Sequence, residues 1–344
     1  MPLNGLPAKR RVAPAARREC CLPLCYTADM VTVVAVDLGG TNLRAAYFPD
    51  DHPHPKAQTK IPTPTHEGPQ AVLHRIIQTI EQVAPADRHD LRIGVGVPGP
   101  LDPVEGVVFD APNVPGWLDI PLKALLQQHF NVPIILGNDA NVAALAEWRY
   151  GAARGSDDML YLTISTGIGG GVIANGRLVL GANGLAGELG HMLVNPGGAL
   201  CGCGQHGHLE AEAAGPAIAR KARERIAAGE RTSLIDAKGP PAEITAEAVG
   251  RAANSGDLLA RAVVEEAGEI IGRQLASLVH AFNPEVIVIG GGVSTIGPLL
   301  FEPMLRALRA HIMHPAFLKN LRVVPAALGD DAGLIGAMVL ARET

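Results

Sequence analysis

The order of apolar and polar residues along the chain predicts strands that alternate with helices. Short runs rich in β-branched residues, at 31–36, 132–136 and 159–165, are bounded by Gly, Asn and Asp and predict buried strands. The segment 258–282 instead repeats apolar residues at three- and four-residue spacing, which predicts a long helix that packs in the core and against another subunit. Together these patterns favour an α/β fold.

The first strand runs into the turn "DLGGTN" at 37–42, which carries candidate chemistry. Its paired glycines allow backbone N–H groups to approach an anion closely, and Thr41 adds a hydroxyl. Asp37, at the end of the strand, is suited to hold a magnesium ion through water. A plain hairpin turn is the alternative interpretation, because glycine turns are common.

Two further glycine clusters follow the same logic. The strand at 159–165 runs into glycines between 166 and 171, so two strand, glycine-turn, strand units suggest a duplicated phosphate-binding hairpin. The glycines at 290–292 end another buried strand and leave bare backbone for a flat adenine or ribose. None of these turns has the Walker pattern or the dinucleotide fingerprint, which indicates that a nucleotide would be held in another way.

A carboxylate stands where the strand at 132–136 passes into a helix. In an alternating α/β chain, ligands bind at the carboxyl ends of strands, so Asp139 is expected to face a site. The alternative is that Asp139 only caps the helix. A helix amino end is also expected to lower the pKa of the Asp139 carboxyl and to leave a weak base.

Composition narrows the class of protein. The chain has 344 residues, 47% apolar and 18% charged, with a net charge of -5, which suits a soluble globular protein of two domains. It has no long basic stripe, so we expect no nucleic acid as partner. Five cysteines are too few for a disulfide scaffold and favour a reducing cytoplasm. Residues 1–29 have no apolar run long enough for a signal peptide or a membrane span, and we expect a disordered tail or a mis-assigned start.

The stretch "GELGHMLVNPGGALCGCGQHGHLE", at 187–210, gathers two cysteines, three histidines and two carboxylates. From the residues alone, three interpretations stay open: a zinc site that performs chemistry, a zinc site that only holds shape, and a chance cluster. Four protein ligands would leave zinc no open position for water, which favours a structural site over a catalytic one.

Seven motifs resemble, in order and approximate spacing, those of the ROK family (repressors, open reading frames, sugar kinases): "DLGGTNLRAA", "GVGVPGPLD", "APNVPGW", "NDANVAALAE", "TISTGIGGGVI", "GELGHM" and "CGCGQHGHLE". They are most similar to its bacterial glucokinase branch, over about residues 31–340. The resemblance implies an actin-like (ribonuclease-H-like) two-domain α/β fold that binds ATP in the cleft between domains and closes on a sugar. We expect a small domain from 31–140 plus 327–344 and a large domain from 141–326.

The resemblance also assigns roles to single residues. It makes Asp139 the general base for the sugar hydroxyl, a role that a weak base can fill because the transition state of phosphoryl transfer is loose. The implied sugar ligands, whose carboxylate, amide and imidazole groups suit vicinal hydroxyls, are Asn113, Asn138, Glu188, His191 and Glu210. The implied phosphate, magnesium and nucleotide positions are Asp37, Gly39, Gly40, Thr41, Thr166, Gly167 and Gly291.

The zinc positions of the family depart from its usual pattern at one place. They correspond here to His191, Cys201, Cys203 and His208, the last of which replaces a cysteine. Zinc accepts two Cys and two His ligands as readily as three Cys and one His, so a structural zinc is still expected. His206 competes with His208, although the Gly-His-Leu-Glu register favours His208. The metal would fix a loop whose two ends carry Glu188 and Glu210.

The function implied by the resemblance is ATP-dependent phosphorylation of a hexose, glucose first, with ATP, Mg2+ and structural Zn2+ as cofactors. Kinases of N-acetylmannosamine or N-acetylglucosamine and fructokinases share the motifs and stay open as alternatives. A sugar-responsive transcriptional regulator is disfavoured, because the 29 residues before the first strand show no two-helix DNA-binding pattern. A zinc hydrolase is disfavoured by the closed ligand set. We expect a homodimer or a dimer of dimers in the cytoplasm.

Overall fold

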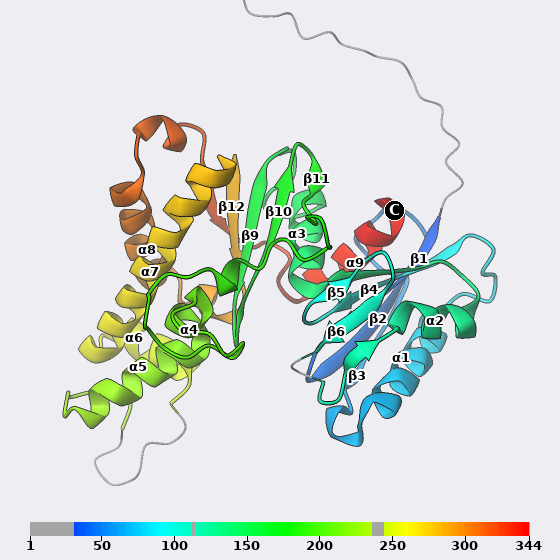
Figure 1. Ribbon diagram of the computed structural model, residues 1–344, viewed down its shortest axis with the longest axis horizontal. Coiled ribbons are helices and arrows are strands. Elements are labelled where there is room, and N and C mark those ends of the chain that lie inside the picture. The colour runs from blue at the N-terminus through cyan, green and yellow to red at the C-terminus, as the bar shows by residue number, and fades with distance from the viewer. Residues whose placement is uncertain (1–30, 112–113, 236–243, 344) are drawn as a thin grey trace, which may run out of the picture.

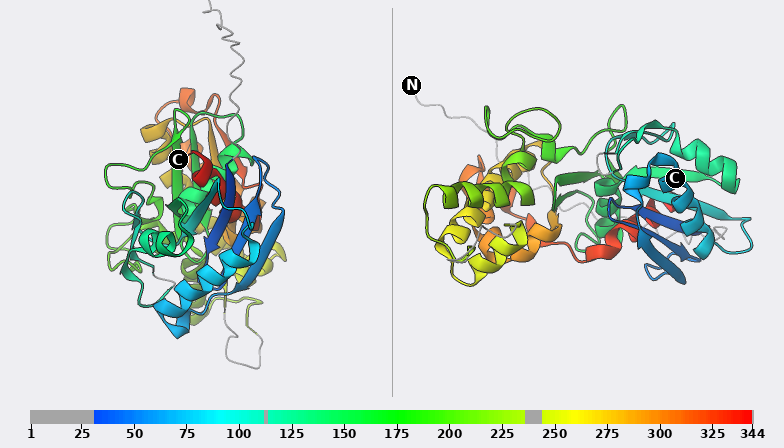
Figure 2. Two further views of the ribbon diagram at one scale, coloured as in Figure 1. Left: turned by 90° about the vertical axis from the view of Figure 1, so that its right-hand side faces the viewer. Right: turned by 90° about the horizontal axis from the view of Figure 1, so that it is seen from below.

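The computed structural model describes residues 31–111, 114–235 and 244–343. The tail expected at 1–29 lies outside these ranges. The described residues form two halves, each built around its own five-stranded sheet, with two helices between them (Figure 1). The right-hand view in Figure 2 shows the same separation from below. Within the described residues, no helix is long and apolar enough to cross a membrane.

The first sheet has the strand order β3-β2-β1-β4-β8. Neighbours among β3, β2 and β1 are antiparallel, and neighbours among β1, β4 and β8 are parallel. The bounds are β1 Thr32–Leu38, β2 Asn42–Phe48, β3 Ala57–Pro62, β4 Leu91–Val97 and β8 Ile134–Asn138.

Both faces of this sheet are covered, which explains the nearly continuous apolar run of β1. Successive side chains of a strand point to opposite faces. Val34 and Val36 pack in one core with α1 (Pro69–Val83) and α2 (Leu122–Phe130). Val33, one position along, packs in a second core on the other face.

The second sheet repeats the arrangement of the first, with the order β11-β10-β9-β12-β13. Again the first three strands pair antiparallel and the last three pair parallel. The bounds are β9 Met159–Ile164, β10 Ile168–Ala174, β11 Arg177–Leu178, β12 Val286–Gly290 and β13 Arg322–Pro325. The two sheets therefore share one topology.

Helices α4 to α8 cover the outer face of the second sheet (Figure 1). Their bounds are α4 Leu209–Ala213, α5 Gly215–Ala227, α6 Ala246–Asn254, α7 Leu258–Phe282 and α8 Pro298–His311. The helix predicted at 258–282 is confirmed with both bounds, because Asp257 caps its start and Asn283 ends it in the left-handed conformation. Short 3-10 helices lie at Thr65–Glu67, Leu189–His191, Gly292–Ile296, Pro315–Leu318 and Gly329–Asp331.

Two helices, α3 (Asp139–Arg149) and α9 (Ala332–Glu343), lie between the sheets and share one core with both of them. Glycines bring these backbones close. A Cβ at Gly336 of α9 would overlap the backbone of Val142 in α3, and one at Gly94 of β4 would overlap Ala337 in α9. The carboxyl-terminal helix thus completes the packing of the first sheet, although the two lie far apart in the sequence.

Three features differ from the sequence-based expectations. The strands predicted at 31–36 and 132–136 end two residues later, because pairing with the neighbouring strands continues to Leu38 and Asn138. The glycines at 169–171 lie in β10 and not in a turn. A small third sheet is formed by β5 (Leu101–Asp102), β6 (Val107–Asp110) and β7 (Leu118–Ile120), whose alternation is too short to be detected in the sequence.

Candidate active site

The junction of β8 and α3 holds the predicted base. Asn138 is the cap of α3, and its side-chain oxygen accepts the N–H groups of Ala140 (2.9 Å) and Asn141 (3.3 Å). Its amide nitrogen donates to the carbonyl of Gly99 (3.2 Å). Asp139 is therefore the first helical residue and not the cap, so the capping role considered for it belongs to Asn138.

The electrostatics of Asp139 differ from the expectation of a lowered pKa. Surrounding protein removes part of the water from the carboxyl, and the negative charges of Asp37 and Glu188 act in the same direction, so the pKa of Asp139 is raised to about 6. The N–H of Ala140 donates to its Oδ1 (2.8 Å) and opposes this shift without outweighing it. The side chain itself remains exposed, so solvent screens part of the effect and a substrate can reach it.

The turn between β1 and β2 leaves backbone donors available. Gly39 donates its N–H to the carbonyl of Asn42 (2.9 Å), and its own carbonyl accepts the hydroxyl of Thr63 (2.6 Å). Among the described residues, no hydrogen bond engages the N–H groups of Gly40 and Thr41. Two adjacent free N–H groups in a glycine turn can bind an anion such as a phosphate.

Asp37 lies at the end of β1 and is held from the neighbouring strand. Arg44, its direct partner in the β1–β2 register, donates from Nε (3.0 Å) and Nη2 (2.5 Å) to Oδ2 of Asp37. Both side chains are about four-fifths buried, at 19% and 18% exposure. No donor from the described part of the chain contacts Oδ1, which leaves one carboxylate oxygen for a cation or its water. Sequence reasoning missed Arg44 and Thr63, because their partners are set by cross-strand pairing.

The turn between β9 and β10 serves a different purpose. The N–H of Ile168 donates to Oε2 of Glu210 (2.9 Å), and a Cβ at Gly167 would come within 2.5 Å of that oxygen. Gly167 therefore makes room for the Glu210 carboxylate, which orients one predicted sugar ligand.

The next glycines, in β10, allow helix α3 to pack closely against the strand. A Cβ at Gly169 would approach Ala140 (2.8 Å), and one at Gly171 would approach Ala144 (2.5 Å). The side chain of Leu189 occupies the corresponding space at Gly170. The expectation that these glycines form a second phosphate turn is thus replaced by a packing role, which holds the helix that begins with Asp139 against the sheet.

A cavity of about 1040 Å³ lies beyond the ends of β9 and β12, a volume suited to a nucleotide-sized ligand. Residues that line it come from the β9 turn, α5, α6 and the segment after β12; they include Thr166, Gly215, Thr245, Asn254 and Gly292. Thr166, a predicted nucleotide ligand, is therefore accessible from this cavity. Gly291 does not line the cavity: its missing Cβ makes room for the backbone of Ile164, and its neighbour Gly292 forms the wall.

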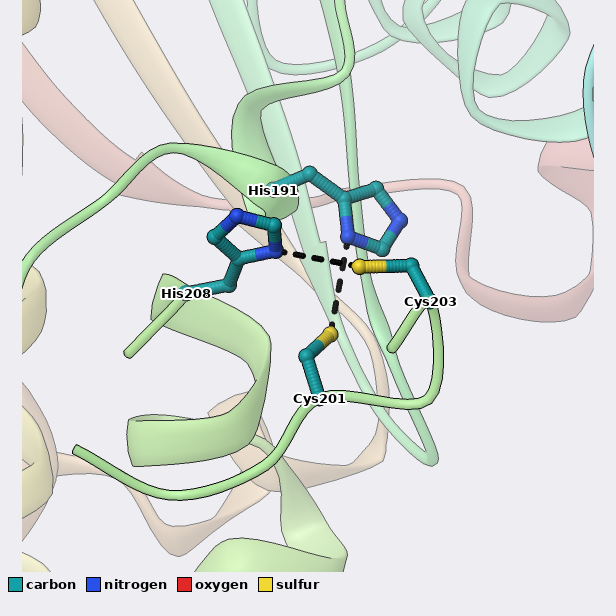
Figure 3. Close-up of side chains that lie close together, drawn as sticks. All are labelled: His191, Cys201, Cys203 and His208. Atoms are coloured by element: carbon teal, nitrogen blue, oxygen red, sulfur yellow. Dashed lines mark hydrogen bonds between the residues drawn. The ribbon is translucent and has the colours of Figure 1, made fainter. Parts of the chain in front are cut away.

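The predicted metal ligands come together in space. Their ligand atoms all lie within 4.8 Å of one another, and the residues are His191, Cys201, Cys203 and His208. Figure 3 shows the two sulfur atoms and one nitrogen of each imidazole ring facing a common centre. Two contacts are short: Sγ of Cys201 to Nδ1 of His191 (3.6 Å), and Sγ of Cys203 to Nδ1 of His208 (3.2 Å).

His206, the competing ligand, is engaged elsewhere. Its Nδ1 lies 2.9 Å from the carbonyl oxygen of Gly198, and it does not belong to the group of four. The geometry thus favours His208, in agreement with the register of the sequence motif. In His191 the second ring nitrogen lies on the side away from the sulfur atoms (Figure 3), so it is available to another partner.

The remaining predicted sugar ligands are only partly placed. Glu188 is exposed, and its negative charge lies near enough to Asp139 to raise the pKa of the Asp139 carboxyl. Glu210 is the second residue of α4, and its Oε1 lies 3.6 Å from Sγ of Cys201, so it joins the metal cluster to the β9–β10 turn. Asn113 lies outside the described residues.

Comparison with known proteins gives consistent results. The model of the ROK family matches residues 33–344. A glucokinase from Thermotoga maritima is 36% identical over 311 residues, which are 90% of this chain and 97% of that protein. A solved ROK family glucokinase from Streptomyces griseus, in complex with glucose and AMPPNP, has a TM-score of 0.77 and 33% identity, covering 91% of this chain and 100% of that one. A solved ROK family transcriptional regulator, a homologue of the E. coli MLC protein, has a TM-score of 0.80 and 28% identity. The match covers 90% of this chain and 78% of that one.

Proposed function

The chain belongs to the ROK family, and we infer that it is a sugar kinase of the glucokinase branch, which transfers the γ-phosphoryl group of ATP to a hexose, glucose first. The observation that carries this function is the Asp139 carboxylate at the end of β8, exposed to substrate and with its pKa raised to about 6. The similarity to glucokinases over nine tenths of the chain supports the same activity.

The mechanism follows from the positions of the side chains. The Asp139 carboxylate accepts the proton of a sugar hydroxyl as that oxygen bonds to the γ-phosphorus; the bond to the bridging oxygen of ADP breaks and ADP leaves. A base with a pKa near 6 is ionised at neutral pH and is a stronger acceptor than an ordinary aspartate. We propose that the free N–H groups of Gly40 and Thr41 hold phosphate oxygens, and that the cavity beside Thr166 takes the nucleoside.

Magnesium is proposed to bind at Asp37. The fit rests on the Oδ1 atom that Arg44 leaves open, a hard oxygen ligand of the kind magnesium prefers. When bound, the ion would neutralise charge on the phosphates of ATP. Arg44 holds the other oxygen and keeps the carboxylate aimed at the turn.

We propose a structural zinc for the His and Cys cluster. Two sulfur and two nitrogen ligands within 4.8 Å of one another are a donor set that zinc accepts, and they leave no open coordination position. The metal would close the loop between Glu188 and Glu210, both of which we propose as sugar ligands together with Asn138 and His191. The Nε2 of His191, directed away from the sulfur atoms, is the atom proposed for a sugar hydroxyl.

The experiment that tests this function is ADP release from ATP with a panel of hexoses and N-acetylhexosamines. We expect glucose to give the highest kcat/KM. A preference for N-acetylmannosamine, N-acetylglucosamine or fructose would assign the chain to one of those alternatives. Tight glucose binding without any ADP release would contradict a kinase and favour a sugar-responsive regulator.

The arrangement of the halves and subunits is also a proposal. We propose a small domain (31–140 plus 327–344) and a large domain (141–326), supported by the separate sheets and by the position of α9. We further propose a homodimer or a dimer of dimers, and light scattering during size-exclusion chromatography would test it. A monomer at micromolar concentration would contradict this assembly.

A further inference from the structure

A buried carboxylate outside the sugar and metal ligands contacts the loop that carries them. Glu212 lies on α4, two residues after Glu210, and is only 5% exposed. Its Oε1 accepts the backbone N–H of Ala199 (2.8 Å) and the side-chain amide of Asn195 (3.1 Å). One oxygen of Glu212 is thus used by the segment 195–199, which leads into the first cysteine of the cluster.

The other oxygen of Glu212 faces the protein interior. Oε2 lies 3.6 Å from Nζ of Lys221 on α5, and Lys221 in turn donates to Glu266 on α7 (2.7 Å). Arg225 of α5 also pairs with Glu266 (3.1 Å). Partial burial acts to raise the pKa of Glu266, but the hydrogen bond and charge of Lys221 outweigh it and the pKa is lowered. A continuous series of charges therefore joins the helical core to the loop.

The loop is shaped to receive this carboxylate. A Cβ at Gly198 would overlap Oε1 of Glu212, so a larger residue there would displace the carboxylate from its position. The carbonyl of Ala199 accepts the N–H of Gly207, so the same peptide segment is also bound to the residue that precedes His208. The ion pair with Lys221 alone would be enough for a carboxylate that only stabilises the core. The two hydrogen bonds from Asn195 and Ala199, and the space left by Gly198, indicate that Glu212 also holds the loop.

We propose that Glu212 is a positioning residue for the sugar site: it fixes the segment 195–199 against α4 without the metal, and so sets the separation of Glu188 and Glu210. This inference rests on the proposed function for its kinetic readout. The loop is then held at two places, by the metal cluster and by the Glu212 carboxylate. Each restricts a different part of the chain between the two sugar-facing carboxylates.

The test compares variants of the full-length, zinc-loaded protein. For Glu212→Ala we expect the KM for glucose to rise about ten-fold, the order seen when residues that orient ligands are removed, while kcat and the KM for ATP change little. Glu212→Gln keeps an oxygen acceptor for Ala199 and should restore most of the sugar affinity. Glu266→Gln, which alters the partly exposed end of the series that lies farther from the loop, should leave the KM for glucose unchanged.

A second pair of variants changes the loop side of the same contact, and it can be used if Glu212→Ala does not fold. Gly198→Ala places a methyl group on Oε1 of Glu212 and should raise the KM for glucose, whereas Gly202→Ala adds the same methyl to open space in the same loop and should not. A folded Glu212→Ala protein with the wild-type KM for glucose would overturn the proposal, as would equal losses in kcat, glucose affinity and ATP affinity.

Hydrogen exchange separates this proposal from the kinase assignment. We expect the backbone amides of Gly198 and Ala199 to exchange at least about ten-fold faster in Glu212→Ala than in the wild type, at equal zinc content, because the buried acceptor of Ala199 is gone. This readout needs no turnover. If the wild type phosphorylates no sugar, the proposed function fails while the positioning role is still decided by exchange; unchanged exchange would overturn the role itself.

Discussion

The two sheets share one strand order, but their glycine turns differ in what the glycines do. In the β1–β2 turn, Asp37 is held by Arg44 and the N–H groups of Gly40 and Thr41 are free of partners among the described residues. In the matching β9–β10 unit, Gly167 accommodates Glu210, and the next glycines accommodate helix α3 and Leu189. Glycine-rich sequences that look alike can thus serve ligand binding in one copy and close packing in the other.

The last strands of the two sheets differ in the same way. The strand β8 ends at Asn138 and is followed by Asp139, whereas the matching strand β13 ends at Pro325 and is followed by Ala326. The two halves therefore differ in the groups that they contribute. The first holds the proposed base and the proposed phosphate donors, and the second holds a nucleotide-sized cavity and the inserted His and Cys cluster.

The largest expected effect comes from the residue that has no counterpart in the second sheet. Asp139→Asn removes the proton acceptor and should lower turnover by roughly 10² to 10⁴, while calorimetry should find glucose and ATP affinities close to those of the wild type. Near-normal turnover in the folded variant would show that Asp139 only begins a helix, and the distinction between the two sheets would be lost.

The metal cluster, inserted only in the second half, gives the next effect. His208→Ala should lower the metal content from about one zinc per chain and raise the KM for glucose by roughly 10- to 100-fold, with ATP affinity kept, because the metal orients sugar ligands only. His208→Cys is the matched control and should keep metal and activity. Full metal retention in His208→Ala would place the fourth ligand at another residue, and a fully active metal-free wild type would contradict the site.

The pH dependence of kcat/KM tests the protonation of Asp139, which belongs to the first half. Because the pKa of Asp139 is raised to about 6, kcat/KM for glucose should fall about ten-fold for each pH unit below 6, where the base becomes protonated. The residual rate of Asp139→Asn should lack this acid limb. An acid limb at or below the ordinary value of 3.8 would contradict the raised pKa of Asp139.

The smallest effect is expected in the second hairpin. Gly171→Ala brings a methyl group against Ala144 and should lower the free energy of unfolding by about 1–3 kcal/mol, as overpacking does, without changing the KM for ATP. Urea denaturation and steady-state kinetics would measure both. A raised KM for ATP at unchanged stability would contradict the packing role and indicate a ligand-binding role for these glycines of β10.

The sequence predicts those parts of the molecule that depend on local pattern. The helix at 258–282 is predicted with both ends, because its apolar spacing and its flanking Asp and Asn are local signals. The four residues of the metal cluster are assigned by the resemblance to the ROK family, with the register favouring His208 over His206, and the structure brings the same four together. The ROK membership and the fold likewise follow from the order of the motifs.

The parts that sequence reasoning missed depend on distant contacts. Arg44 and Thr63 gain their roles from pairing with Asp37 and from contact with Gly39, which no single segment reveals. The predicted direction of the Asp139 pKa shift is wrong, because a helix amino end was weighed without the burial and the negative charges contributed by other strands and loops. The third sheet, built from strands of two to four residues, escapes prediction because so short a run gives no periodic signal.

The position of α9 has a consequence for the synthesis of the chain. The first sheet is complete in sequence at Asn138, but one of its faces is covered by a helix that begins at Ala332. At about 5–20 residues per second, a ribosome needs roughly 10–40 s to make the residues in between. During that time the face that includes Val33 and Ala35 lacks the part of its cover that α9 provides, and transiently exposed apolar surface of this kind favours aggregation.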